Sequence, residues 1–134
     1  MFVYYKFIDR MSNTEVLIKR VYDSVDENDG LRVLVDRLWP RGISKDKLKC
    51  DIWAKEIAPS PELRKMFHAN IENNWTIFTD GYIHELELSP SFNDFITKIR
   101  KDNPKRVTLL YAFKNKIKNH ALILQQEIIK KLGE

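Results

Sequence analysis

Residues Arg32–Leu48 read RVLVDRLWPRGISKDKL, an apolar run that ends in arginines, a tryptophan, a proline and a glycine. Its first part, Val33, Leu34 and Val35, is apolar without alternation, which is typical of a strand buried on both faces of a parallel sheet. We therefore predict a strand over residues 31–38. Because both of its faces are expected to be covered, helices are expected on each side of the sheet.

Two further runs predict strands that pair with it. RVTLLYAF, at residues 106–113, follows the breaker pair Asn103 and Pro104, and EVLIKRV, at residues 15–21, precedes a run of turn formers. Because the crossover between parallel strands is right-handed, the two core strands should point the same way. The predicted fold class is α/β, a small, mostly parallel sheet covered by helices in a single domain.

The segments between and after the core strands show helical spacing. Asp51 is expected to cap a helix over the IWAKEIA segment that follows it. Ser60–Pro61 and Ser89–Pro90 each combine a capping hydroxyl with a proline at the first helical position. The final helix follows Asn119, which is expected either to cap that helix or to donate to a ligand.

Length and composition are those of one ordinary domain. The chain has 134 residues, of which 43% are hydrophobic and 31% charged. It is therefore long enough to bury a core without a stabilising disulfide or metal ion. Residues 1–13 are expected to be an N-terminal extension or accessory strand, and residues 14–134 a single domain. The start of the chain is too short and too charged for a signal peptide or membrane span. Because Cys50 is the only cysteine, we expect no internal disulfide and a cytoplasmic location.

Ligands of open α/β sheets bind outside the carboxyl ends of the strands. The candidate ligand-binding residues at that edge are Asp36, Arg37, Trp39, Arg41 and Gly42 after one strand, and Tyr111, Lys114 and Asn119 after the other.

The chemistry of the first loop suits an anion. Arg37 and Arg41 present planar donor forks for phosphate or carboxylate, and Trp39 could stack on a base. Asp36 would orient a ligand or act as a base, and Gly42 allows the turn. The structural alternatives are an ion pair between Asp36 and Arg37 and a core position for Trp39.

The sequence shows no motif for a metal site or for a cofactor site. The three histidines and Cys50 have no recognised metal-ligand spacing, and the four glycines are isolated, so we expect no metal and no cofactor. The net charge of +4 predicts weak, salt-sensitive nucleic-acid binding at most. We expect no membrane partner, and the sequence carries no signal for an oligomeric state or a reaction type.

Two functions from different classes fit these residues. One is a protein that binds or processes an anionic, phosphate- or nucleotide-like small molecule at the sheet edge. The other is a non-catalytic interaction module whose basic face meets nucleic acid or an acidic protein. A pocket that gathers Arg37, Arg41, Tyr111 and Asn119 favours the first function. A flat surface of lysines favours the second.

Five segments together resemble a known family. They are KRVYD, DGLRVLVDRLWPRGISKDKL, WAKEIAPSPELRKMF, WTIFTDGYIHEL and VTLLYAFKN with the later NHALIL. From about Val16 to the C-terminus, they are similar to the YeaO-like family, domain of unknown function 488. The resemblance implies an α/β domain of the cytosol with uncharacterised biochemistry.

The family's signature polar positions carry over to this chain residue by residue. They are Lys19, Arg20, Tyr22, Asp36, Arg37, Trp39, Arg41, Gly42, Ser60, Arg64, Tyr111, Lys114 and Asn119. After Lys114, members of the family often have an acidic residue and a histidine, whereas this chain has Asn115 and Lys118. That departure weakens an acid–base role for the second loop.

Overall fold

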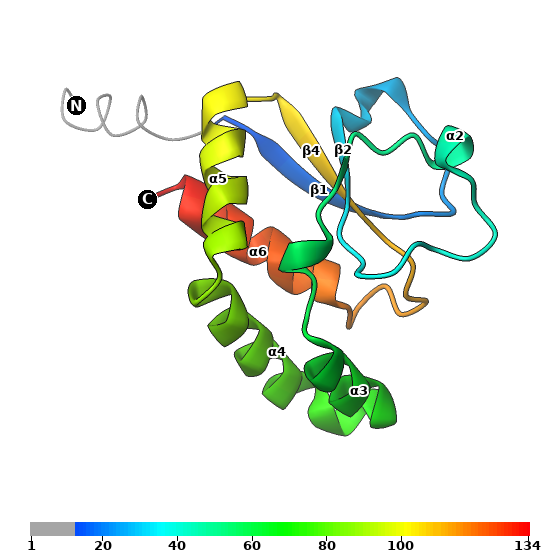
Figure 1. Cartoon of the computed structure of the whole chain (residues 1–134), viewed down its shortest axis with the longest axis vertical. Helices are drawn as coiled ribbons and strands as arrows, with labels where there is room; N and C mark the ends of the chain where they lie inside the picture. The colour runs from blue at the N-terminus through cyan, green and yellow to red at the C-terminus, as the bar shows by residue number, and fades with distance from the viewer. Residues whose placement is uncertain (1–12) are drawn as a thin grey trace.

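In the computed structural model, which describes residues 13–134, four parallel strands form one sheet in the order β1-β4-β2-β3 (Figure 1). The strands are β1 (Glu15–Arg20), β2 (Leu31–Leu34), β3 (Ile52–Trp53) and β4 (Arg106–Tyr111). Residues 1–12 of the expected N-terminal extension lie outside the described residues. The predicted α/β class with a parallel sheet is confirmed.

The described chain also contains helices between and after the strands. The α-helices are α2 (Lys45–Leu48), α3 (Pro61–Ala69), α4 (Ile71–Glu87), α5 (Pro90–Asp102) and α6 (His120–Leu132), and two 3-10 turns are η1 (Glu27–Asp29) and η2 (Lys55–Ile57). Ser60 and Ser89 cap α3 and α5 as predicted, each accepting a backbone N–H three residues on.

The helix predicted after Asp51 is wrong. Ile52 and Trp53 instead form the short edge strand β3, because the Asp51 N–H donates to the Arg32 carbonyl and the Ala54 N–H to the Leu34 carbonyl. The spacing of four residues between Trp53 and Ile57 suits a helix, but it also occurs when a strand is followed by a 3-10 turn, as here. Apolar spacing alone therefore could not distinguish the two structures.

The central pair β2–β4 is parallel, with Val33 opposite Leu109. β2 is shorter than the predicted strand. The Val35 N–H still donates to Leu110 O at 3.0 Å, but at Asp36 the chain leaves the sheet. Both core strands therefore end at one edge, as the crossover rule requires.

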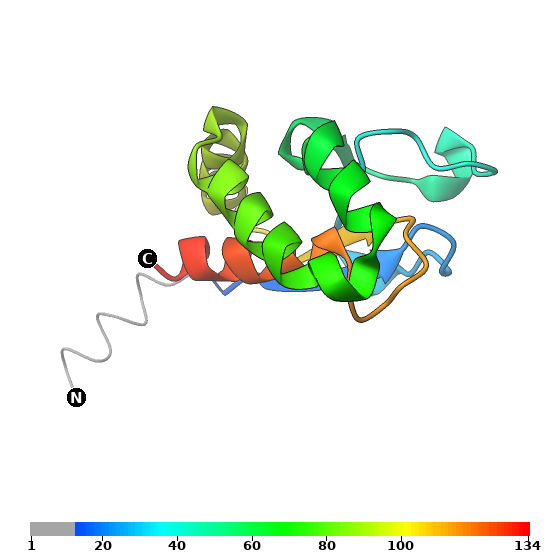
Figure 2. The same cartoon turned by 90° about the horizontal axis from the view of Figure 1, so that it is seen from below.

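Alternate residues of the strands face opposite sides of the sheet. Val33, Val35, Leu109 and Tyr111 belong to the main core, where α3, α4, α5 and α6 pack. In Figure 1 these helices lie to the left of and below the strands, and α2 lies to the right. Figure 2 shows α3 beside α4, with the α2 segment at the opposite end of the molecule from α5.

In the described part of the chain the second face has no long helix, so the expectation of helices on each side is wrong. Its apolar part is a smaller cluster around Leu34, Leu48 and Leu110, covered by the segment that contains the one-turn α2. A hydrogen bond from the Arg32 side chain to the Leu48 carbonyl (2.8 Å) fastens that segment to the sheet. A segment without regular secondary structure can cover a sheet when a buried side chain donates hydrogen bonds to the carbonyl groups of that segment.

Candidate binding site at the carboxyl edge of the sheet

Asp36 joins the ends of three strands. Its Oδ2 accepts the Ala112 N–H at 3.0 Å, beyond the end of β4, and its backbone carbonyl accepts the Trp53 Nε1–H at 2.8 Å, from β3. The carboxylate is therefore engaged with the backbone of the neighbouring strand. This contact does not require a ligand to explain why an aspartate follows β2.

His120, the first residue of α6, is the polar neighbour that the sequence analysis missed. Its Nε2 lies 3.0 Å from Val35 O and 3.1 Å from Asp36 Oδ1. Both neighbours of Nε2 are acceptors, so this nitrogen carries the hydrogen, which points to the carbonyl. Asp36 Oδ1 is buried and has no well-aligned hydrogen bond within the described part of the chain. The ion pair between Asp36 and Arg37, the structural alternative for these residues, is not formed.

Arg37 reaches across to the backbone before α3. Its Nε donates to Pro59 O at 3.3 Å and its Nη2 to Ala58 O at 3.1 Å. The same side chain lines a cavity of about 120 Å³. The other residues around that cavity are Glu56, Ile57, Ala58, Ser60, Tyr82, Glu85, Leu86 and Ser89.

Trp39 is partly buried and packs on the second face. Its Nε1–H donates to Ile43 O at 2.7 Å, and its ring meets that of Trp53 edge-on, with centroids 5.4 Å apart. The hydrogen bond from the indole therefore stabilises the turn between Trp39 and Ile43. Gly42, in that turn, has a φ of 77° and open space where a Cβ would stand, so its backbone angle is what favours glycine.

Tyr111 and Asn119 are buried, at 3% and 0% exposure. Tyr111 belongs to the main core, and burial raises its pKa. Asn119 caps α6: its Oδ1 accepts the Leu122 N–H and its Nδ2 donates to Asn115 O, both at 2.9 Å. The structure places neither side chain at the surface or on the cavity that Arg37 lines.

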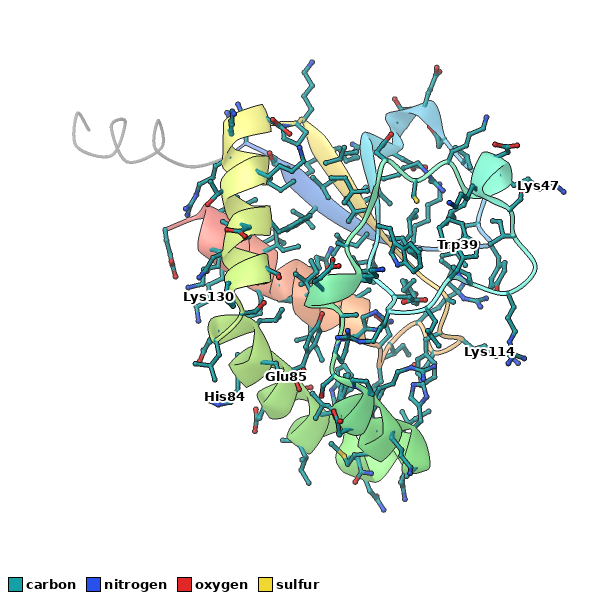
Figure 3. All side chains as sticks on the ribbon, viewed as in Figure 1. Trp39, Lys47, His84, Glu85, Lys114 and Lys130 are labelled. Atoms are coloured by element: carbon teal, nitrogen blue, oxygen red, sulfur yellow. The ribbon has the colours of Figure 1, made fainter. Side chains whose placement is uncertain are left out.

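Arg41 and Lys114 are exposed on the loops after β2 and β4. Figure 3 shows Lys114 projecting from the same side of the molecule as Trp39 and Lys47. Arg20, at the end of β1, donates to Ala112 O at 2.7 Å, and its guanidinium lies 5.1 Å from the Tyr22 ring centroid. The Tyr22 hydroxyl in turn donates to Arg41 O at 2.8 Å, which ties the loops after β1 and β2 together.

A group of aromatic and basic side chains lies near α3. His68 stacks on Phe113, with ring centroids 4.7 Å apart and planes at 8°. Partial burial lowers the pKa of His68, and the positive charges of Arg64 and His120 lower it further. The loop after β4 is also fastened to α4 by an ion pair between Lys118 and Glu72.

The candidates thus divide into an inner and an outer set. Asp36 and Arg37 hold backbone groups beneath the edge, whereas Arg41 and Lys114 are displayed to solvent. Across residues 13–134, His120 Nε2 is hydrogen bonded to Val35 O, and no serine, threonine or cysteine side chain is hydrogen bonded to this ring. The described residues contain no cluster of three or more side chains placed to hold a metal ion. No helix in that region has the length and apolar character needed to cross a membrane.

Comparison with known proteins gives consistent matches. Residues 15–134 match the family model described as the inactive DUF488-N3 subclade. The uncharacterized protein YeaO of Escherichia coli K12 is 48% identical over 106 residues, which cover 79% of this chain and 90% of that protein. The uncharacterized protein Rv3073c of Mycobacterium tuberculosis H37Rv is 40% identical over 114 residues, covering 84% and 92%. No solved structure matches the chain.

Proposed function

The chain belongs to the inactive DUF488-N3 subclade of the DUF488 family, and from that premise we propose that it is a non-catalytic domain that binds phosphate-bearing anions. The binding groups are the exposed cations at the carboxyl edge of the sheet. A cytoplasmic setting, where nucleotides and nucleic acid are abundant, is part of the same proposal.

The hydrogen bonds of the inner residues support a binding function without catalysis. Asp36, the one candidate base, has Oδ2 on the Ala112 N–H and Oδ1 beside His120 Nε2. A general base must reach the proton it abstracts, and a carboxylate held by the sheet beneath the surface does not. Tyr111 and Asn119 are likewise committed to the core and to the α6 cap.

The observation that carries the proposal is the outer set of cations. Arg41 and Lys114, together with the partly buried Arg20, come from loops or strand ends that follow three adjacent strands, and within residues 13–134 none of them forms an ion pair with a carboxylate. The Asp23 carboxylate shares this edge, but its Oδ2 accepts the Arg20 N–H. Guanidinium and ammonium groups without a carboxylate partner suit phosphate oxygens.

The shape of this surface determines how tightly we expect the anion to bind. Arg41 and Lys114 are exposed and line neither the cavity beside Arg37 nor the one beside Gly30, so the anion is bound at an open surface and remains partly solvated. Exposed charge pairs contribute little each and are screened by salt. We therefore expect weak affinity that depends strongly on ionic strength.

The proposal is tested by titrating the protein with ATP while its amide resonances are recorded. We expect shifts confined to the loops after β1, β2 and β4, and no such shifts with adenosine, which lacks phosphate. Lys114→Ala and Arg41→Ala should weaken ATP binding. Lys130→Ala is the matched control, because this exposed lysine lies on the other side of the molecule (Figure 3).

Three results would contradict the proposal. They are adenosine binding as well as ATP, Lys130→Ala weakening ATP as much as Lys114→Ala does, or no shift with either compound. A single-stranded oligonucleotide distinguishes a nucleotide from nucleic acid as the source of phosphate. With three phosphate contacts, its affinity should fall about twentyfold between 50 and 200 mM salt. A tight complex that survives salt would identify nucleic-acid binding as the main activity.

A further inference from the structure

The cavity beside Arg37 is separate from the exposed cations and has a different chemistry. It holds about 120 Å³ between η2, the start of α3 and the second half of α4. Charged side chains of both signs line it, with Arg37 facing the same space as Glu56 and Glu85. Figure 3 shows Glu85 on α4 directed toward the segment that leads into α3.

One part of the cavity wall offers hydrogen-bond donors. Arg37 uses Nε and Nη2 on the carbonyls of Pro59 and Ala58, and its Nη1 makes no hydrogen bond to residues 13–134. The Ser60 and Ser89 hydroxyl oxygens accept the N–H groups of α3 and α5, which leaves both hydroxyl hydrogens free to donate. A carboxylate would satisfy these donors.

The rest of the polar wall offers acceptors. Tyr82 is 0% exposed and donates its hydroxyl hydrogen to Ile57 O at 2.6 Å, so it is part of the wall and does not bind a ligand. Burial, followed by the charges of Glu85 and Asp36, raises the pKa of Tyr82 well above its ordinary value, which keeps the hydroxyl protonated. Glu85 Oε1 accepts the Ser60 N–H at 2.9 Å, and its Oε2 has no protein donor in the described chain. An ammonium group would satisfy these acceptors.

A ligand with one sign of charge fits only part of this cavity. A simple anion would face Glu56 and Glu85, and a simple cation would face Arg37. The volume also excludes a nucleotide, since drug-sized ligands occupy roughly 300–1,000 Å³. We propose that the cavity beside Arg37 binds a small zwitterion, a molecule that carries a carboxylate and an ammonium group. The carboxylate lies on Arg37 and the serine hydroxyls, and the ammonium lies on Glu85 and Glu56.

The probes for calorimetric titration are L-alanine, propionate and propylamine. They are of similar size, and only alanine carries both charges. We expect propionate and propylamine each to bind about tenfold more weakly than alanine, equivalent to about 1.4 kcal/mol. The alanine methyl group is expected to contact Leu86 and Ala58, which supply the apolar wall.

Two conservative variants locate the ammonium. Glu85→Gln keeps an oxygen for the Ser60 N–H but removes the charge, and Glu56→Gln removes the charge of an exposed side chain. Each should weaken alanine binding by about tenfold. Glu87→Gln is the matched control, because this exposed glutamate is on the same helix but outside the cavity, and it should leave alanine binding unchanged.

The proposal is overturned if propionate or propylamine binds as tightly as alanine, if Glu87→Gln weakens alanine as much as Glu85→Gln does, or if none of the three probes binds at the highest soluble concentration. Arg41→Ala and Lys114→Ala should leave alanine binding unchanged. A failure of this proposal is therefore distinguishable from a failure of phosphate binding at the exposed cations.

Discussion

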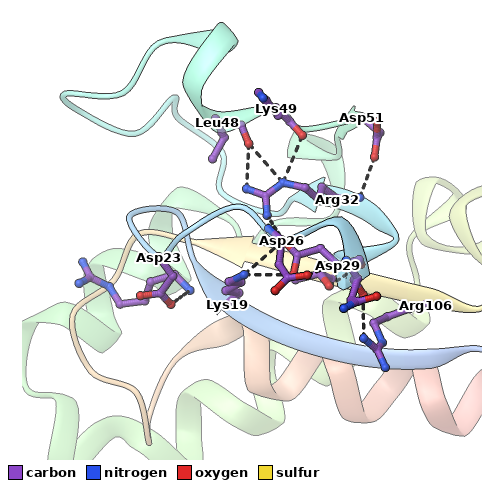
Figure 4. A network of polar contacts seen from close by, with 12 residues as sticks. Lys19, Asp23, Asp26, Asp29, Arg32, Leu48, Lys49, Asp51 and Arg106 are labelled. Atoms are coloured by element: carbon purple, nitrogen blue, oxygen red, sulfur yellow. Dashed lines mark hydrogen bonds and ion pairs between the residues drawn. The ribbon is translucent and has the colours of Figure 1, made fainter.

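Asp29 shows how a single buried carboxylate organises the second face of the sheet. It is 7% exposed and accepts from Lys19 Nζ at 3.0 Å, from Arg32 Nη1 and from the Asp26 N–H (Figure 4). Burial alone would raise the pKa of Asp29, but the hydrogen bonds from Asp26, Lys19 and Arg32 outweigh it, so the pKa lies below its ordinary value. Arg32 is itself 4% exposed, and Asp29 is its counter-charge.

Asp29→Asn should lower the free energy of unfolding by about 3 kcal/mol at neutral pH, because it leaves the Arg32 guanidinium buried without a counter-charge. Since the folded-state pKa of Asp29 is depressed, its contribution is present above the ordinary aspartate pKa of about 3.9 and is lost as the pH falls through the lower folded value. Urea unfolding at neutral and acid pH should show the gap between the two proteins closing in acid.

The matched control for that experiment is Asp80→Asn, an exposed aspartate on α4, which should change the free energy of unfolding by less than about 0.5 kcal/mol. If Asp29→Asn unfolds like Asp80→Asn at neutral pH, the buried ion pairs contribute nothing to the fold. The same would follow if the gap between Asp29→Asn and the wild type were independent of pH.

At the scale of the elements, N-caps decide where the helices begin. Ser60, Ser89 and Asn119 each accept a backbone N–H in the first turn. Asn119 differs from the serines because it is fully buried and also donates to Asn115 O, the carbonyl of the loop that follows β4. One residue therefore sets both the start of α6 and the path of the chain that leads into it.

Asn119→Ala should cost about 2–3 kcal/mol of unfolding free energy, the sum of a lost cap and a buried carbonyl left without its donor. Ser89→Ala, which removes only a cap, should cost about 1 kcal/mol. Chemical denaturation compares the two, and hydrogen exchange should show faster exchange of the Leu122 amide in Asn119→Ala. Equal costs for the two variants, together with lost ATP binding in Asn119→Ala, would instead make Asn119 a ligand donor.

At the scale of the whole molecule, one sheet serves two cores. Leu109 belongs to the main core and Leu110, the next residue, to the second cluster. Trp39 and Trp53 pack against that second cluster, whereas Trp75 packs against the main core. Because neighbouring residues of the same strand supply both cores, loss of packing on either side exposes apolar residues of β4 to water.

The two faces should therefore unfold together. Trp75→Phe leaves fluorescence from the second face, and Trp39→Phe combined with Trp53→Phe leaves fluorescence from the helical face. Within each variant, the fluorescence and circular dichroism transitions in urea should coincide, as two-state unfolding requires. A fluorescence transition that precedes the circular dichroism transition when only Trp39 and Trp53 remain would show that the α2 segment opens separately.

Local pattern determined much of this protein. The unbroken apolar run at Val33–Val35 and the largely apolar run in β4 indicated a buried parallel sheet, and the serine–proline pairs indicated the starts of α3 and α5. The resemblance to the YeaO-like family is confirmed as well. These features could be predicted because each depends on residues that are close together in the sequence, where spacing and capping act directly.

The tertiary structure decided what the polar residues of the edge do. Asp36 meets the Ala112 N–H 76 positions away, and His120 meets the Val35 carbonyl 85 positions away. It also placed Arg37 and Glu85 on one cavity, although they come from the segment after β2 and from α4. No local spacing encodes such contacts, because the side chains meet only after the crossover has brought the ends of the strands and the helices together.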